Sequence, residues 1–135
     1  MKAKTVDSMG FYQFYKGTPP LSTLDLGQIP EIEAWLKKYN ISNYRINTDG
    51  TINILGDLNL INKGLTELPD YIKFETVYGS FYGHNNNWQS LEGLPKDIRG
   101  NFELYAPWDP LYLTYKKFTR DEIIEKINIQ GRFLI

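Results

Sequence analysis

The residues of this 135-residue chain that could do chemistry centre on His84, the only histidine in the sequence. A nucleophile–histidine–carboxylate relay needs a hydroxyl or thiol group and an acid beside the imidazole. Ser80 precedes His84 by four residues. On one strand this spacing separates the two side chains by about 13 Å, too far for proton transfer. Asp57 and Glu103 could approach His84 from neighbouring strands and form a metal site with it. We expect instead a surface histidine, no catalytic residue and no bound metal.

The composition excludes several other kinds of site. The chain has no cysteine, which rules out disulfides and cysteine-based zinc or iron–sulfur centres. Its 15 basic and 16 acidic residues give a net charge of −1, which provides no general attraction for nucleic acid or an anionic membrane. The segment between Gly79 and Gly83 lacks the lysine and the following helix of a phosphate-binding loop. We therefore expect no cofactor.

Hydropathy sets the expected location. Apolar residues make up 41% of the chain, enough for the core of one domain. No stretch approaches the roughly 18 apolar residues that cross a bilayer, and residues 1–16 lack the apolar region of a secretory signal. We expect a cytoplasmic protein that does not bind membranes.

Three similar segments must position His84 and its neighbours. They begin at Gly56, Gly79 and Gly100, which are 23 and 21 residues apart. Apolar residues at the second position after each glycine and at the fourth position, where the second repeat instead has Gly83, are typical of a short strand with one buried face. Asn62 and Asn85 follow at the sixth position, where a side-chain amide could bond the backbone of a turn. Stacked repeats share one core. The expected inward side chains are Leu58, Leu60, Phe81, Phe102 and Leu104.

The alternate residues of the same strands should form an outward face, which is our candidate for binding a protein. Tyr82 and Tyr105 lie near the centre of this predicted face, and tyrosine offers a large, rigid contact area. Trp88 takes the repeat position of Leu65 and should fill the core, whereas Trp108 takes no repeat-leucine position. The predicted partner-binding residues of the repeats are Asp57, Asn59, Tyr82, His84, Glu103, Tyr105 and Trp108.

A helix and a hairpin are predicted before the repeats, over residues 30–55. Pro30 suits the first turn of a helix, and the apolar stripe that follows it ends near Asn40. Polar and apolar residues alternate on both sides of Asp49 and Gly50, and glycine can adopt the positive φ of a tight hairpin turn.

Residues 114–135 should close the array of repeats, which spans residues 56–113. Thr119 and Glu122 have the spacing of a helix capping box. Gly131 then turns the chain into a last strand, residues 132–135. The buried stripe of the helix should comprise Ile123, Ile124 and Ile127.

Residues 1–29 form an aromatic-rich extension of the same single domain. Four aromatic residues occur between Phe11 and Tyr15, ahead of a segment rich in glycine and proline. Such a run either packs against the domain or forms an exposed, partner-binding patch of Phe11, Tyr12 and Tyr15.

Residues 30–135 resemble the short leucine-rich-repeat-like proteins that many bacteriophages and some bacteria encode. The hairpin, the first two repeats and the C-terminal helix and strand carry the resemblance, in residues 43–52, 56–69, 79–102 and 119–135. The resemblance implies an α+β fold. The expected fold begins with a helix and a β-hairpin. A short, irregular leucine-rich-repeat-like β-solenoid sheet comes next, and a C-terminal helix and strand close the sheet.

The resemblance also bears on function. The repeat sheet, the aromatic content of 15% and the lack of a catalytic constellation lead us to expect a non-catalytic protein–protein interaction module. The resemblance sharpens this expectation, by analogy, to a phage-encoded inhibitor of a host defence enzyme, such as an anti-CRISPR protein acting in the host cytoplasm. Three alternatives stay open. One is a single-stranded nucleic-acid binder that stacks bases on tyrosines, which the near-neutral charge disfavours. Another is a structural protein that assembles as a homodimer through an open repeat edge. The last is an enzyme centred on His84, Asp57 and Glu103.

Overall fold

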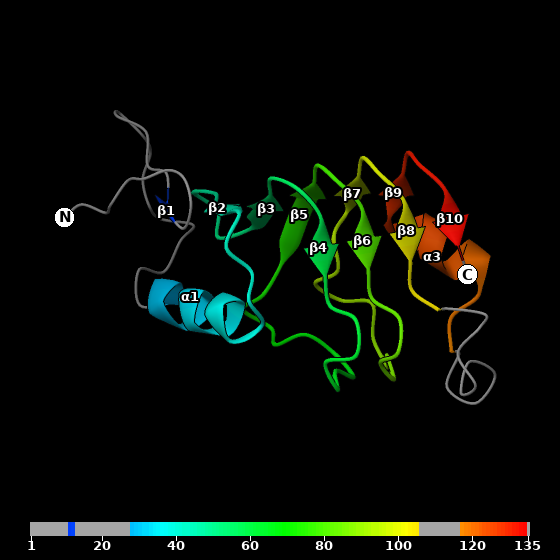
Figure 1. Cartoon of the computed structure of the whole chain (residues 1–135), viewed down its shortest axis with the longest axis horizontal. Helices are drawn as coiled ribbons and strands as arrows, with labels where there is room; N and C mark the ends of the chain where they lie inside the picture. The colour runs from blue at the N-terminus through cyan, green and yellow to red at the C-terminus, as the bar shows by residue number, and fades with distance from the viewer. Residues whose placement is uncertain (1–10, 13–27, 106–116, 135) are drawn as a thin grey trace.

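The computed structural model describes residues 11–12, 28–105 and 117–134. In this part of the chain, two helices and ten short strands form an elongated α+β molecule, with the helices towards opposite ends (Figure 1). The helices are α1 (Ile29–Lys38) and α3 (Arg120–Lys126). Neither of them has the length and apolar character that a membrane crossing requires.

The strands form two sheets that run along the long axis (Figure 1). The six-stranded sheet, in the order β1-β2-β3-β5-β7-β9, consists of β1 (Phe11–Tyr12), β2 (Tyr44–Ile46), β3 (Ile52–Ile54), β5 (Phe74–Val77), β7 (Asp97–Ile98) and β9 (Asn128–Ile129). The four-stranded sheet, in the order β10-β8-β6-β4, consists of β4 (Leu58–Asn59), β6 (Phe81–Tyr82), β8 (Phe102–Glu103) and β10 (Phe133–Leu134). Strands β2 and β3 pair antiparallel, and the other pairs in the described residues are parallel.

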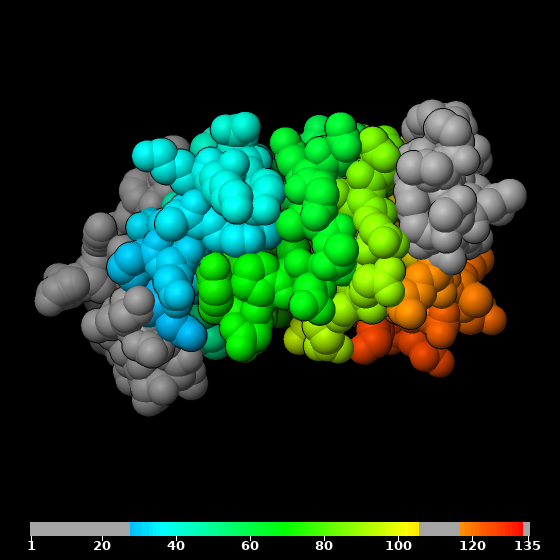
Figure 2. Space-filling model, turned by 90° about the horizontal axis from the view of Figure 1, so that it is seen from below, coloured from blue at the N-terminus to red at the C-terminus, as the bar shows by residue number. Residues whose placement is uncertain are grey.

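From β3 onward, successive strands alternate between the six-stranded and the four-stranded sheet, and we call each successive pair of them a coil. The coils are β3–β4, β5–β6, β7–β8 and β9–β10. The sequence predicts only the second strand of each of the later coils. Strands β7 and β9 have two residues each, and β5 buries its first and last residues around a register shift, so none of them shows a clear alternating pattern. Seen from below, α1 and the loops after β4 and β6 follow one another along the long axis (Figure 2).

The core is built from rows of side chains in register. Leu58, Phe81, Phe102 and Phe133 are partners across the four-stranded sheet, and the first three are fully buried. The Phe102 ring lies 5.4 Å from that of Phe81 and 5.3 Å from that of Phe133, the spacing of favourable aromatic pairs. The predicted inward residues, including Leu60 and Leu104, are all buried, so this prediction is confirmed.

The repeated glycines mark the corners where the chain passes from one sheet to the other. The N–H of Gly79 donates to the carbonyl of Gly56, that of Gly100 to Gly79, and that of Gly131 to Gly100, at 2.8 to 2.9 Å. A Cβ on Gly79 would lie 2.7 Å from the carbonyl carbon of Gly56, and one on Gly100 equally close to that of Gly79. The coils can stack at this distance only because these residues have no side chain.

The residue after each corner glycine bonds the next coil. Asp57 Oδ1 accepts from the N–H of Ser80 at 2.7 Å, and Ser80 Oγ accepts from the N–H of Asn101 at 2.9 Å. Asn101 Oδ1 accepts in turn from the N–H of Arg132 at 2.8 Å. This ladder of side chains fixes the register of successive coils at the corner.

The helix and hairpin before the repeats agree with the sequence. Helix α1 begins at Ile29 with proline in its first turn and buries Ile32, Trp35 and Leu36. In the hairpin, Gly50 has φ +89° and Asp49 accepts hydrogen bonds from the backbone and hydroxyl of Thr51. Partial burial raises the pKa of Asp49, but these bonds outweigh it, so the pKa lies below its usual value.

The turn asparagines act differently from the prediction. Asn62 and Asn85 have φ of +54° and +62°, so they serve the turns by adopting the left-handed conformation that asparagine tolerates. The amide that bonds the backbone belongs to Asn86, which is buried. Its Oδ1 accepts from the N–H groups of Lys63 and Leu65 at 2.9 and 3.0 Å. Its Nδ2 donates to the carbonyls of Leu60 and Gly83 at 2.6 and 3.1 Å.

The C-terminal segment agrees with the sequence except at one residue. Both hydrogen bonds of the capping box between Thr119 and Glu122 form. Ile123 and Ile127 are buried, but Ile124 is 50% exposed, so its predicted burial is wrong. Ile124 follows Ile123 by one residue, which corresponds to a rotation of about 100° around the helix axis. Its side chain therefore lies away from the face that Ile123 and Ile127 share. The predicted last strand is present as β10.

Candidate functional site

The outward face of the four-stranded sheet carries one row of predicted site residues in register. Asn59 pairs with Tyr82, and Tyr82 pairs with Glu103, on three adjacent parallel strands. Asn59 is exposed, Tyr82 is partly exposed and Glu103 is buried. The predicted face therefore exists from β4 to β6 and becomes enclosed at β8.

His84 and Glu103 come together from adjacent strands, although we expect a surface histidine from the sequence. Nδ1 of His84 lies 2.7 Å from Oε1 of Glu103, and the two side chains are 14% and 10% exposed. The carbonyl of His84 accepts from the N–H of Asn62 in the preceding coil at 3.1 Å, which fixes the backbone beside the pair. The imidazole of His84 is therefore a polar partner for the buried carboxylate of Glu103. The histidine is largely enclosed and does not lie on the surface as expected.

Asp57 does not complete a metal site with this pair. Its Oδ1 accepts from Ser80 at the glycine corner, as part of the ladder between coils. Across the described residues, no group of three or more His, Asp or Glu side chains could hold a metal ion. Ser80 likewise uses its Oγ to accept from Asn101. Asp57 and Ser80, two of the side chains that could have joined His84 in chemistry, therefore hold the stack in register.

Tyr105 is the clearest correction to the predicted face. It is fully buried, although the alternating pattern places it outward. Strand β8 ends at Glu103, so the alternation of sides stops there, and Leu104 and Tyr105 are both buried as the chain leaves the sheet. The Tyr105 hydroxyl accepts from the N–H groups of Lys117 and Phe118 at 3.0 and 3.1 Å. Tyr105 is therefore a structural residue that ties the start of the C-terminal segment to β8.

The remaining predicted partner-binding residues lie outside the described residues or in the short strand β1. Trp108 and Tyr15 are outside the described residues. Phe11 and Tyr12 form strand β1, which pairs in parallel with β2 through Arg45 and Ile46. The backbone of this part of the aromatic run thus extends the six-stranded sheet.

Sequence reasoning missed an exposed ridge at the residues that precede the corner glycines. Leu55 and Tyr78 are 42% and 45% exposed, and the Arg99 guanidinium lies over the Tyr78 ring at 4.9 Å. Arg99 Nε also donates to Asp97 at 2.9 Å. Hydrogen bonds from Arg99, and then from Asn128 and Gln130, hold the pKa of Asp97 below its usual value. The spacing of these residues, one before each glycine, is the signal that could have located the ridge.

Comparisons with known proteins identify no relative: no protein-family model, curated protein or solved structure matches this chain.

Proposed function

We propose that the chain is a short leucine-rich-repeat-like solenoid that acts as a non-catalytic protein-binding module. Four coils that each place one strand in each of two sheets support the solenoid, as do the corner glycines and the rows of buried side chains. Repeat stacks of this kind commonly bind partners on their extended surfaces. The use of Asp57, Ser80 and Asn101 in the ladder supports a binding role over a catalytic one.

The binding surface that we propose is the outward face of β4 and β6. The observation that carries the proposal is the registered pair of Asn59 and Tyr82, which stands over a fully buried row and is held by backbone bonds between coils. A face fixed in this way loses little conformational entropy on binding. Tyrosine beside a small polar group is typical of binding hot spots.

The partner that we propose is a host defence enzyme, such as a CRISPR nuclease, encountered in the host cytoplasm. This step rests on the resemblance of residues 30–135 to phage-encoded proteins and is an argument by analogy. The exposed carboxylate of Asp57 beside the proposed face disfavours the phosphates of single-stranded nucleic acid.

A pull-down with matched tyrosine variants tests this function. The tagged protein, Tyr82→Ala and Tyr78→Ala are each used to capture proteins from a bacterial host lysate. Tyr78 is the control, because it is exposed on the same β5–β6 coil but on the ridge outside the proposed face. We expect a stoichiometric partner with the wild-type protein and Tyr78→Ala, and its loss with Tyr82→Ala. Equal recovery with all three proteins, or a salt-sensitive shift of single-stranded RNA or DNA by the wild-type protein, contradicts the proposal.

A further inference from the structure

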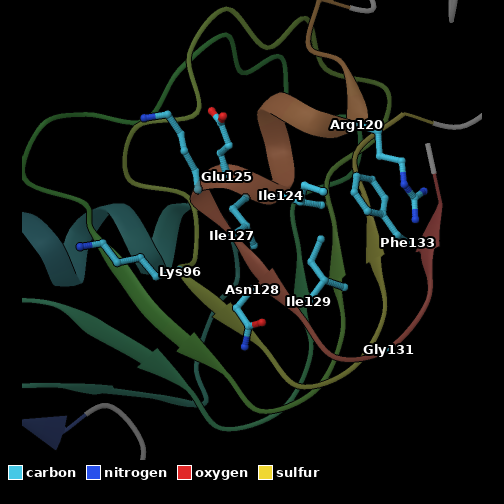
Figure 3. A pocket seen from close by; sticks show the side chains of 10 residues that line it. Lys96, Arg120, Ile124, Glu125, Ile127, Asn128, Ile129, Gly131 and Phe133 are labelled. Carbon is cyan, nitrogen blue, oxygen red and sulfur yellow. The ribbon is translucent and has the colours of Figure 1, made fainter.

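Both sheets end at the last coil of the described chain, which is formed by β9, Gly131 and β10. Helix α3 lies beside this coil, and a hollow of about 460 Å³ lies between the helix and the coil (Figure 3). Polar and apolar side chains line the hollow, and the apolar ones include Ile124, Ile129 and Phe133. In each earlier coil, the next coil of the stack takes this place.

The backbone of β9 has an outward-facing edge at Ile129. The N–H groups of Asn128 and Gln130 donate to the carbonyls of Lys96 and Ile98, at 2.8 and 2.9 Å. Because backbone groups alternate in direction along a strand, the N–H and the carbonyl of Ile129 point the opposite way, out of the end of the stack.

Strand β10 has the matching edge at Phe133. The carbonyl of Arg132 accepts from the N–H of Phe102 at 2.7 Å. The N–H of Phe133 belongs to the same planar peptide group, so it points out of the end of the stack. Ile129 and Phe133 each lie two residues from Gly131, so the two edge positions are at about the same height along the strands of the two sheets. A partner can pair with both only if it presents two strand edges at the separation of the two sheets.

A second copy of the chain has such a pair of edges in its own last coil. A two-fold axis that crosses both sheets at this height sets each β9 antiparallel to the other β9, and each β10 antiparallel to the other β10. Ile129 and Phe133 would then lie opposite their own counterparts as hydrogen-bonded pairs, in which each residue donates once and accepts once. A single added strand would pair with only one of the two edges.

The N-terminal end of the described chain does not offer two level edges. There the six-stranded sheet continues past β3 through β2 and β1, whereas the four-stranded sheet ends at β4 (Figure 1). A last coil docked at that end could pair with only one of the sheets. The difference between the two ends favours a closed pair of copies over head-to-tail growth into a filament.

The charges at the last coil do not oppose a second copy. Both lysines that line the hollow already interact with carboxylates of the same chain. The other two charged side chains of the lining, Arg120 and Glu125, have opposite signs. The end therefore carries no excess of one charge that would repel an identical end.

We propose that two copies of the chain form a closed dimer through their last coils, in which β9 and β10 each pair with their counterparts. The two sheets would then run through both copies, and the row of side chains that ends at Phe133 would continue across the interface. The half-exposed Ile124 lines the same end and would lie at this interface. The proposed face at Asn59 and Tyr82 lies on earlier coils, so the dimer would present two such faces.

Light scattering of the full-length protein tests the dimer, and we expect twice the mass of one chain. Ile129→Pro removes the outward N–H of β9, and it should raise the dissociation constant of the dimer about tenfold or more, because the symmetric pair loses both of its hydrogen bonds. Asn59→Pro is the matched control, because it places a proline on β4, the edge strand at the other end of the four-stranded sheet. It should change the dissociation constant less than about twofold. Circular dichroism checks that both variants fold.

A single introduced cysteine reports which residues meet, because the chain has no cysteine of its own. Opposite residues of a hydrogen-bonded antiparallel pair have Cα atoms about 5.5 Å apart, within the range of a disulfide. We expect Ile129→Cys to give a disulfide-linked dimer on oxidation, whereas Tyr78→Cys, exposed on an earlier coil, should stay monomeric on a denaturing gel. Tyr82→Ala should leave the dimer unchanged, which separates this interface from the proposed function.

Three results would overturn the proposal. The first is a monomeric mass up to millimolar concentration. The second is equal weakening of the dimer by Ile129→Pro and Asn59→Pro, which would indicate head-to-tail contact. The third is equal cross-linking of Ile129→Cys and Tyr78→Cys, because it would show that the copies do not meet at a two-fold axis through the last coil.

Discussion

The indole N–H of Trp88 donates to the carbonyl of Gly83 at 2.7 Å, inside the core. Gly83 stands where the neighbouring repeats have Leu60 and Leu104, and the ring of Phe81 fills the space of the missing side chain. Trp88 takes the position of Leu65 and is fully buried, as the sequence predicts. The two unusual residues of the second repeat therefore form one structural unit.

Shortening Trp88 should destabilise the protein. Trp88→Leu restores the residue type of the first repeat but leaves a cavity, and we expect a loss of about 2–4 kcal/mol in the free energy of unfolding. Trp88→Phe keeps most of the volume and removes the donor to Gly83, which should cost about 1–2 kcal/mol. Urea denaturation followed by circular dichroism measures both. Wild-type stability in Trp88→Leu would show that the second repeat repacks without the indole.

Removing the amide of Asn86 should be among the most damaging polar substitutions. Asn86→Ala leaves the buried N–H of Leu65 and the carbonyl of Leu60 without their partner, and we expect a loss of about 3 kcal/mol. Asn86→Asp keeps the acceptor but removes the donor and buries a charge, so it should be no milder. Asn87→Ala is the control, because Asn87 is exposed and should change stability by less than about 0.5 kcal/mol. Similar losses at both positions would contradict the assigned role.

The corner glycines permit a test that separates steric from backbone effects. A Cβ on Gly79 would collide with Gly56 and with the Asp57 carboxylate, so Gly79→Ala should cost about 2–3 kcal/mol. Gly64 has φ +70° and nothing within 4 Å of its added Cβ. Gly64→Ala therefore carries only the strain of a left-handed alanine, about 1 kcal/mol. Thermal unfolding should rank the two variants in this order, and the reverse order would show that the coils can separate at the corner.

Acid should weaken the protein partly through Asp97. Its pKa is lowered by hydrogen bonds from Arg99, Asn128 and Gln130, so the folded chain binds fewer protons at this site than the unfolded chain. The resulting stability is complete above the ordinary aspartate pKa of about 3.9 and is lost as the pH falls through the lower, folded value.

Urea midpoints at about pH 3 and about pH 7 should therefore differ less in Asp97→Asn than in the wild-type protein. Asp49→Asn should have the same effect, because the pKa of Asp49 is also lowered. If Asp97→Asn leaves the pH dependence unchanged, the network across β7 and β9 does not favour the ionised carboxylate.

The sequence predicts the α+β fold where local patterns are long or repeated. The stripe of α1, the hairpin at Gly50 and the capping box at Thr119 all form as expected. The strands β5, β7 and β9 escape prediction because two to four residues do not define a period.

The candidate site could be predicted only in part. Alternation correctly places Asn59 and Tyr82 outward and Phe81 inward, because these residues lie within strands. It fails at Tyr105, which lies beyond the end of β8 and whose hydroxyl accepts from Lys117 and Phe118, 12 and 13 residues further along the chain. The sequence allows His84 and Glu103 to approach one another from adjacent strands, but it predicts an exposed histidine and not this enclosed pair.

The glycine corners make the coil the unit in which this molecule can grow. Each corner presents two acceptors to the next coil: a side-chain oxygen and the backbone carbonyl of a glycine. They belong to Asp57 and Gly56 at the first corner and to Ser80 and Gly79 at the second. A duplicated coil would meet the same two surfaces that its neighbours already present, whereas an insertion of arbitrary length at a corner would break the ladder. Gene duplication or design could therefore lengthen the protein in steps of one coil, and its outer face would widen in proportion.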